Sequence, residues 1–216
     1  MDASFFSSLA VLKAGGIFIY PLFAVGLVAV GCSIDRFYVF WRQGALPRIL
    51  ARRLENPHFD WAELLAALSH APSHSGFVRF FRVIVENSHQ PVWWIETRAG
   101  DEAAQLERSL DQGLWVLETA VTAAPLLGLL GTIAGMVGAF RLFGDNNAVD
   151  PGKVTGGVAE ALIATAIGIV IALVALASFN FFSHRRSILL DEMERLGSRL
   201  IDRIRLDREQ PEGAEG

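Results

Sequence analysis

Residues 160–183 read EALIATAIGIVIALVALASFNFFS and carry one ionisable side chain, that of Glu160, at their start. The 23 residues that follow are uncharged, and about 20 apolar residues suffice for a helix to cross a bilayer. A carboxyl within a membrane helix costs roughly 2.5–3.5 kcal/mol at full depth, and it usually faces protein or a water-filled path. This stretch therefore predicts a membrane helix with a carboxyl suited to moving protons or ions.

The rest of the chain also has the composition of a membrane protein. Of its 216 residues, 52% are hydrophobic and 19% are charged. Residues 14–34 and 119–140 form two further uncharged stretches of spanning length. Gly31-Cys32 resembles a lipoprotein cleavage site, but the first stretch is longer than a signal core, so we expect a retained helix. We predict an all-α membrane protein with three transmembrane helices and helical cytoplasmic extensions.

The arginine distribution predicts the orientation of these helices. Nine arginines lie between the first and second stretches, and seven follow the third. The segment before the first stretch has only Lys13, and the loop between the second and third has only Arg141 and Lys153. Because basic loops stay in the cytoplasm, the N-terminus is expected outside and the C-terminus inside.

The expected layout follows from these spans and from breaks in the helical pattern. The expected segments are a periplasmic N-terminal segment 1–13, transmembrane helices 14–34, 118–140 and 160–183, a helical cytoplasmic insert 35–117, a periplasmic loop 141–159, a cytoplasmic amphipathic helix 184–206 and a disordered tail 207–216. Within the insert we expect helices at 46–69, 76–87 and 92–117, the last running directly into the second span. The amphipathic helix should continue the third span, because apolar residues recur there at helical spacing, namely Leu189, Met193, Leu196, Leu200 and Ile204.

The second span carries glycines on one helical face. They are Gly128, Gly131, Gly135 and Gly138, with Thr132 at the edge of that face. Small residues let membrane helices approach closely, so for the glycines we favour helix packing over a direct part in transport. For Thr132 a polar path and a bond back to its own backbone both stay open.

The third span carries a matching stripe of small residues. It contains Glu160, Ala164, Gly168, Ala172 and Ala175, with Thr165 beside it. Ala164 and Gly168 are predicted to pack against the second span. Glu160 is expected to be functional, although a place at the outer water interface is the alternative, since all the uncharged residues follow it.

Pro125 and Pro21 each remove a backbone donor, so kinks are predicted in the second and first spans. Glu118 is expected as a hydrated carboxylate at the inner end of the second span. His70 and His74 are four residues apart, but Pro72 between them breaks any helix that would align them as metal ligands. We expect no metal, no cofactor, no nucleic-acid binding and no enzymatic activity.

Two strings in these spans are similar to signatures of a known family. Residues 124–136, APLLGLLGTIAGM, and 158–168, VAEALIATAIG, resemble the membrane motifs of the MotA/TolQ/ExbB proton-channel family. Residues 13–37 resemble that family's first span, with Gly15-Gly16, Pro21 and Asp35-Arg36 at corresponding places. The overall size and the phrase ALIATAIG are most like the ExbB branch.

The resemblance implies roles for individual residues. Glu160 matches the family's third-span carboxyl, and Thr132 and Thr165 match hydroxyls that line its proton path. Asn180 matches a polar residue near the inner end of the third helix. Val174 and Ile17 stand where many members have proline, which puts the helix geometry there in question.

It also implies partners and a location. An ExbB-like chain would form a homo-oligomer, a pentamer in the ExbB case, in lipid of the inner membrane of a Gram-negative bacterium. The ring would enclose an ExbD/TolR-like single-span protein with its own membrane aspartate, and it would drive a TonB-like transducer for import across the outer membrane. A TolQ-like subunit of the Tol-Pal envelope system and a passive membrane scaffold are the alternatives.

Overall fold

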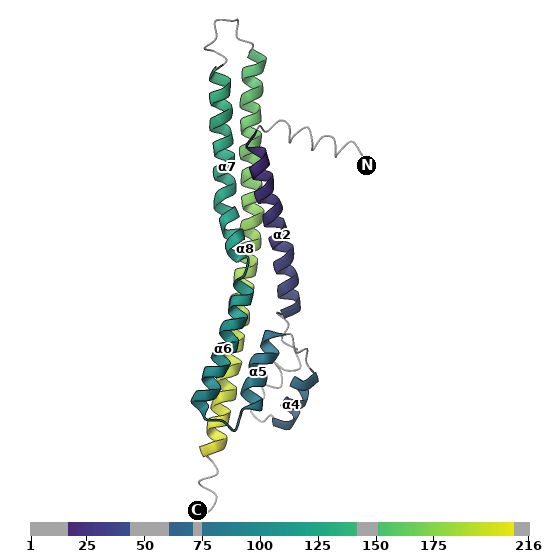
Figure 1. Cartoon of the computed structure of the whole chain (residues 1–216), viewed down its shortest axis with the longest axis vertical. Coiled ribbons are helices and arrows are strands. Elements are labelled where there is room, and N and C mark those ends of the chain that lie inside the picture. Colours follow the sequence, from purple (N-terminus) through teal and green to yellow (C-terminus); the bar gives the residue numbers. More distant parts are fainter. Residues whose placement is uncertain (1–16, 44–60, 71–74, 142–150, 210–216) are drawn as a thin grey trace, which may run out of the picture. The chain divides into compact units, whose positions relative to one another are not determined.

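The computed structural model describes residues 17–43, 61–70, 75–141 and 151–209, and within them every regular element is an α-helix (Figure 1). In chain order the helices are α2 (Ile19–Gln43), α4 (Trp61–His70), α5 (Gly76–Glu86), α6 (Val92–Asp111), α7 (Leu114–Arg141) and α8 (Pro151–Glu209). Three of them, α2, α7 and α8, contain stretches long and apolar enough to cross a membrane. The predicted all-α fold with three spanning helices is confirmed for these residues.

The chain divides into two compact units. The first contains Met1–Ile34 and Gly113–Phe181, and the second contains Asp35–Gln112 and Phe182–Gly216. Helices α2 and α8 contribute to both. The predicted segment 1–13, residues 142–150 of the predicted loop 141–159 and most of the predicted helix at 46–69 lie outside the described residues. So do residues 210–216 of the predicted disordered tail 207–216, whereas its residues 207–209 belong to α8.

Helix α8 is longer than the predicted third span at both ends. It is one helix of 59 residues. It begins at Pro151, so residues 151–159, which we expected in a loop, are helical. At the other end α8 continues without a break past residue 183, as the five apolar residues at helical spacing from Leu189 to Ile204 predicted. All five of these apolar residues are at most 3% exposed.

Helices α6 and α7 are separate, which corrects the predicted continuous helix from residue 92 into the second span. Helix α6 ends at Asp111 and α7 begins at Leu114. Between them Gly113 has φ 81°, a left-handed conformation that costs roughly 1–2 kcal/mol for other residues. Glycine therefore allows the chain to break the helix here.

The two prolines occupy different helical positions. Pro125 lies inside α7, where it cannot donate a hydrogen bond to the Val121 carbonyl one turn earlier. Pro21 is the third residue of α2, and the first backbone bond of that helix runs from the Leu22 N–H to the Phe18 carbonyl, at 3.3 Å. A proline in the first turn removes no helical bond, so Pro21 suits the start of α2 and not the mid-helix kink that we predicted.

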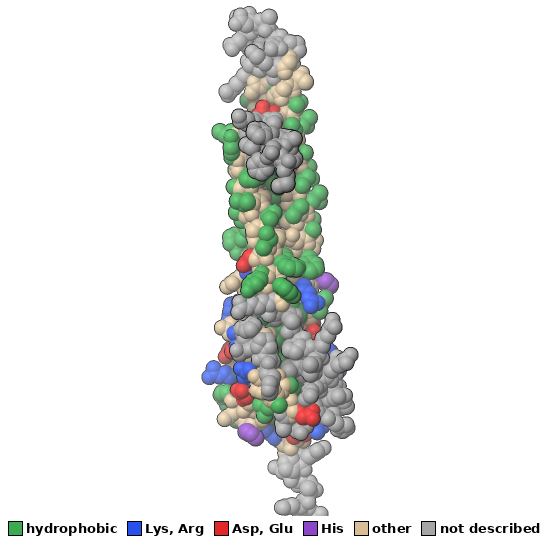
Figure 2. Space-filling model, turned by 90° about the vertical axis from the view of Figure 1, so that its right-hand side faces the viewer, with side chains coloured by type: hydrophobic (Ala, Val, Ile, Leu, Met, Phe, Trp, Pro, Cys, Tyr) green, Lys and Arg blue, Asp and Glu red, His purple; other side chains and the backbone are tan. Residues whose placement is uncertain are grey.

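In the first unit the three spanning helices share one apolar cluster. Leu22 of α2, Ala124 of α7 and Ala172 of α8 form its buried centre. Val25, Leu127, Ile167 and Ile171 pack around them. Figure 2 shows hydrophobic side chains along the length of this unit on the visible face, as expected for helices that face lipid.

The second unit has a buried apolar core of the kind found in water-soluble domains. Helix α5 packs against α4 and α6, and it buries most of its apolar side chains, among them Phe77, Phe81 and Ile84. The Cβ that a side chain at Gly197 of α8 would add lies 2.6 Å from the ring of Phe80, so α8 approaches α5 closely. Charged side chains gather on the surface of this unit (Figure 2).

Two arginines of the second unit bind α6. Arg36 of α2 is only 6% exposed, and it donates to Asp35 and to the carbonyl of Ser109, the latter at 3.1 Å. Arg186 of α8 binds carboxylates of α6, at Glu107 (3.1 Å) and Asp111 (2.5 Å). These contacts hold α2 and α8 to α6.

Candidate functional site

Helices α7 and α8 meet along a seam of small residues in the first unit. A Cβ added at Gly128 would lie 2.9 Å from the Cα of Thr165, and one at Gly168 would lie 2.6 Å from the carbonyl oxygen of Ala124. Both positions approach backbone atoms, which cannot rotate away. The predicted packing role of these two glycines therefore agrees with their contacts.

The seam continues toward the start of α8. Cβ atoms added at Gly131 and Gly135 would lie 3.1 Å from the Cβ of Ala164 and 2.7 Å from the Cβ of Ala161. Residues later in α7 therefore contact residues earlier in α8, so the two helices are antiparallel. Ala164 is 1% exposed, in agreement with its predicted packing role.

Gly138 makes no such contact with the described residues of α8, so its packing role stays a prediction. No described atom lies within 4 Å of a Cβ added there. The next residue, Ala139, is 5% exposed, and its Cβ lies 3.5 Å from a Cβ added at Gly157. We missed Ala139, Ala161 and Gly157, although small residues at helical spacing upstream of Ala164 were a signal for the last two.

Thr165 is the polar group that crosses the seam. Its hydroxyl donates to the carbonyl oxygen of Gly128 on α7, at 2.8 Å. Interhelical bonds of this kind are worth about 0.6 kcal/mol in a membrane protein. The close approach of the two backbones at Gly128 makes this short bond possible.

Thr132 behaves differently from Thr165. Its hydroxyl donates to the carbonyl of Leu129 within α7, at 2.7 Å, which is the back-bonded arrangement that we left open. Its side chain is half-buried. Thr132 lies one turn after Gly128, and so one turn from the carbonyl that Thr165 binds.

Glu160 is the tenth residue of α8, about 14 Å along the axis from the helix start. Glu160 is half-buried as a residue, and the next residue, Ala161, is packed against Gly135. Glu160 therefore lies at the edge of the seam and inside a helix, instead of at a helix end. At the other end of α7, Glu118 is exposed.

This arrangement has the groups that proton transfer along a seam would need. A hydroxyl has one donor and two acceptor lone pairs, so Thr132 and Thr165 can still accept a proton donor while they donate to carbonyls. Glu160 adds a group that can be charged or neutral.

The second unit contains a separate groove of about 560 Å³ between α6 and α8. Small residues of α6, such as Ala99 and Ala103, form one wall. Two of its acidic residues, Glu96 and Glu107, are already paired with Arg205 and Arg186. Among the described residues, no group of three His, Cys, Asp or Glu side chains is placed to hold a metal ion.

Comparison with known proteins assigns the chain to a family. The sequence profile described as the MotA/TolQ/ExbB proton channel family matches residues 72–195, which is more than half of the chain. The chain belongs to this family. Its membership confirms the resemblance that the strings at 124–136 and 158–168 indicated.

Individual relatives agree with this assignment. "Putative biopolymer transport protein ExbB-like 3" of Synechocystis sp. is 31% identical over 192 residues, covering 78% of this chain and 81% of the relative. "Putative biopolymer transport protein ExbB-like 1" of the same organism is 28% identical over 195 residues, covering 86% and 74%. "Biopolymer transport protein ExbB" of Aquifex aeolicus is 37% identical over 89 residues, covering 41% and 60%. The chain is a multi-pass membrane protein of this proton-channel family.

Proposed function

We propose that the chain is the ExbB-like subunit of an inner-membrane motor that couples the proton gradient to a TonB-type transducer, and so to import across the outer membrane. The observation that carries this proposal is the position of Glu160, a half-buried residue well inside α8 and beside the seam that the Thr165 hydroxyl crosses. Relatives named as ExbB and ExbB-like proteins support the branch of the family.

The proposal includes an orientation in the inner membrane of a Gram-negative bacterium. The residues between the first two spans, and those after the third, hold 16 of the 19 basic residues, which favours their place in the cytoplasm. The start of α8, with Glu160, then lies toward the periplasm. The N-terminus lies on the same side.

In the proposed mechanism several copies of the chain, a pentamer as in ExbB, surround the single span of an ExbD/TolR-like partner. Protons from the periplasm reach the partner's membrane aspartate along Thr132 and Thr165. Glu160 sets the electrostatic potential of this path or holds subunit contacts. Each proton that crosses 100 mV releases about 2.3 kcal/mol, which is available to move the ring against the partner.

Growth on a ferric chelate tests this proposal. Cells lacking their own ExbB-type proteins receive this chain together with its neighbouring partner gene, either unaltered or as Glu160→Gln. Glu118→Gln is the matched control, because it removes an exposed carboxylate from the other end of the membrane helices. We expect rescue by the unaltered chain and by Glu118→Gln, and failure of Glu160→Gln at equal membrane levels.

The other outcomes are informative. Equal rescue by Glu160→Gln would keep the motor but assign the essential carboxyl to the partner alone. No rescue by any form would contradict TonB coupling. The chain would then be tested in cells lacking TolQ, where recovery of detergent resistance would identify the TolQ-like function. Recovery in neither strain would favour a passive scaffold.

The threonines are tested by Thr132→Val and Thr165→Val in one chain. Valine keeps the shape of threonine but removes the hydroxyl, and the Thr165 bond to Gly128 is worth only about 0.6 kcal/mol. We expect the ring to assemble and proton coupling to be lost. Loss of assembly would instead show that the hydroxyls serve packing.

A further inference from the structure

Three arginines with described side chains lie close to the point where α2 and α8 leave their apolar stretches, and two of them are paired with described acidic side chains. Arg36 is bound to Asp35, and Arg186 is bound to carboxylates of α6. Arg185 is exposed, and no described acidic side chain is within ion-pair distance of it. It is the second residue after the uncharged run 161–183 on α8. An unpaired cation therefore lies at the end of a membrane helix.

An aromatic pair defines the facing sides of α2 and α8 at this level. The rings of Phe40 and Phe182 are stacked with their centroids 5.3 Å apart. Next to this stack, Arg36 of α2 and Arg186 of α8 both reach α6, as described above. Helix α6 therefore covers one side of the α2–α8 pair, and the opposite side is defined by the helical positions that point away from these two arginines.

Helical geometry places Phe37 and Arg185 on that opposite side. Each residue turns an α-helix by about 100°, so Phe37 lies about 60° from Phe40, in the direction away from Arg36. By the same rule, Arg185 lies about 60° from Phe182, in the direction away from Arg186. Both residues therefore border the same uncovered face.

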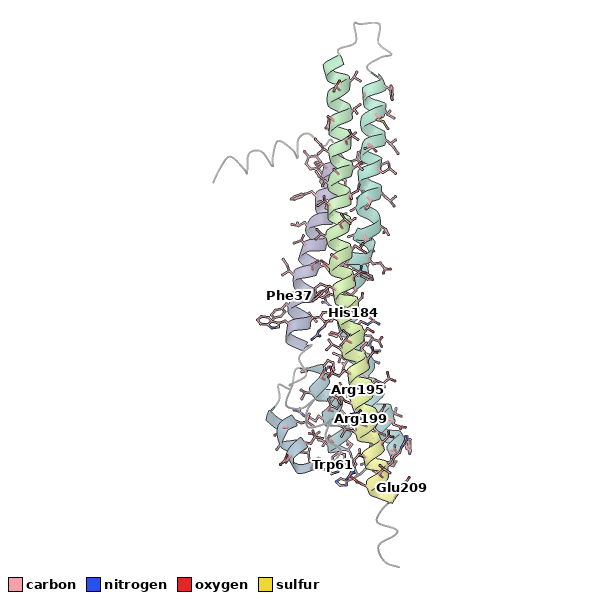
Figure 3. The ribbon with its side chains drawn as sticks, turned by 180° about the vertical axis from the view of Figure 1, so that it is seen from behind. Phe37, Trp61, His184, Arg195, Arg199 and Glu209 are labelled. Atoms are coloured by element: carbon pink, nitrogen blue, oxygen red, sulfur yellow. The ribbon has the colours of Figure 1, made fainter. Side chains whose placement is uncertain are left out.

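Trp41 extends this face, about 100° from Phe40 on the side of Phe37. Trp41 is 77% exposed and Phe37 is 60% exposed, which agrees with a face that no described helix covers. Figure 3 labels Phe37 on α2 and His184, the neighbour of Arg185, on α8 at adjacent levels. An apolar ring, an indole with one N–H and a cation thus lie on the same side of the α2–α8 pair, each within about one helical turn of the Phe40–Phe182 stack.

We propose that this face, formed by Phe37, Trp41 and Arg185, binds the headgroup of an anionic phospholipid. The Arg185 guanidinium and the Trp41 indole N–H would donate to the phosphate, and Phe37 would lie against the first methylenes of an acyl chain. The proposal goes beyond the proposed function, and it uses only the membrane location of the chain.

Charge and position favour a lipid over other occupants. Tryptophan is enriched where helices leave the hydrocarbon, because its ring is apolar and its N–H is polar. A basic residue near an anionic membrane surface contributes about 1 kcal/mol of attraction. The face lies at the end of the uncharged run of α8, so the lipid that surrounds that run reaches it without any change in the protein.

Native mass spectrometry of the purified full chain in mild detergent tests the proposal. Phosphatidylglycerol and phosphatidylcholine with the same acyl chains are added, and bound lipid is counted for the unaltered chain, Arg185→Gln and Arg185→Lys. The matched control is Arg199→Gln, which removes another exposed arginine of α8 about 21 Å further along the helix (Figure 3).

We expect Arg185→Gln to bind phosphatidylglycerol about five-fold more weakly, close to its binding of phosphatidylcholine. Arg185→Lys and Arg199→Gln should keep the preference for phosphatidylglycerol. Trp41→Phe removes only the indole N–H, and it should give a smaller loss even where Arg185→Gln fails to accumulate. Equal binding by Arg185→Gln and the unaltered chain, or an equal loss with Arg199→Gln, overturns the proposal. A change in oligomer mass with lipid binding unchanged would assign this face to a second copy of the chain and would also overturn it.

Discussion

Substitution of Gly168 by alanine tests the packing of α7 against α8. The added Cβ would lie 2.6 Å from the carbonyl oxygen of Ala124 and 3.3 Å from the Cα of Gly128. Both atoms belong to the backbone, so the two helices must move apart. Overpacking of this kind costs about 1–3 kcal/mol, while alanine in place of glycine stabilises a helix by about 0.5–1 kcal/mol. We therefore expect a net loss of about 0–2.5 kcal/mol in the free energy of unfolding.

Gly156→Ala is the matched control, since it lies on the same helix and no described atom is within 4 Å of its added Cβ. It should be neutral or slightly stabilising. The free energy of unfolding is measured by titrating the purified chain in mild detergent with sodium dodecyl sulfate and following helix content by circular dichroism. If Gly168→Ala is as stable as Gly156→Ala, the backbones are not in contact at the seam, and our account of Gly128 and Thr165 is wrong.

Two further substitutions probe the second unit and the break before α7. Gly113→Ala should lose about 1 kcal/mol of unfolding free energy in the same titration, because φ at Gly113 is 81°. The control Gly100→Ala, in the middle of α6 where no described atom is near the added Cβ, should lose nothing. Equal stability of the two variants would show that alanine is not strained at position 113. Arg186→Gln removes two partly exposed ion pairs, with Glu107 and Asp111, and it should lower the free energy of unfolding by about 1 kcal/mol or less. This loss should shrink as the salt concentration is raised from 0.01 to 1 M. A loss independent of salt would mean that the side chain stabilises the unit by packing.

Most of the fold was predictable from local patterns. Uncharged runs identified the three spanning helices, because a bilayer imposes a minimum apolar length. The periodic series from Leu189 to Ile204 correctly predicted that α8 continues past its span with one buried face. The break at Gly113 was missed because the apolar pattern on both sides is helical, and only the positive φ of one glycine separates α6 from α7.

The candidate site was predictable in composition but not in contacts. The sequence indicated Glu160, Thr132, Thr165 and the small residues around them. It did not show that Thr165 donates across to α7 whereas Thr132 donates within it, because both lie at similar places on small-residue faces. Nor did it separate Gly138 from Ala139, since a rotation of one residue position decides which of them meets the partner helix.

By itself the sequence determined the class of the protein, its spanning helices and the family signatures, since hydrophobic length, charge placement and short motifs are properties of contiguous residues. Only the tertiary structure decided which glycines must be glycine and which hydroxyl crosses the seam. It also decided which arginine near the end of the α8 span has no ion-pair partner among the described residues. Those outcomes depend on distances between residues far apart in the chain, and the rotation of one helix against another sets those distances.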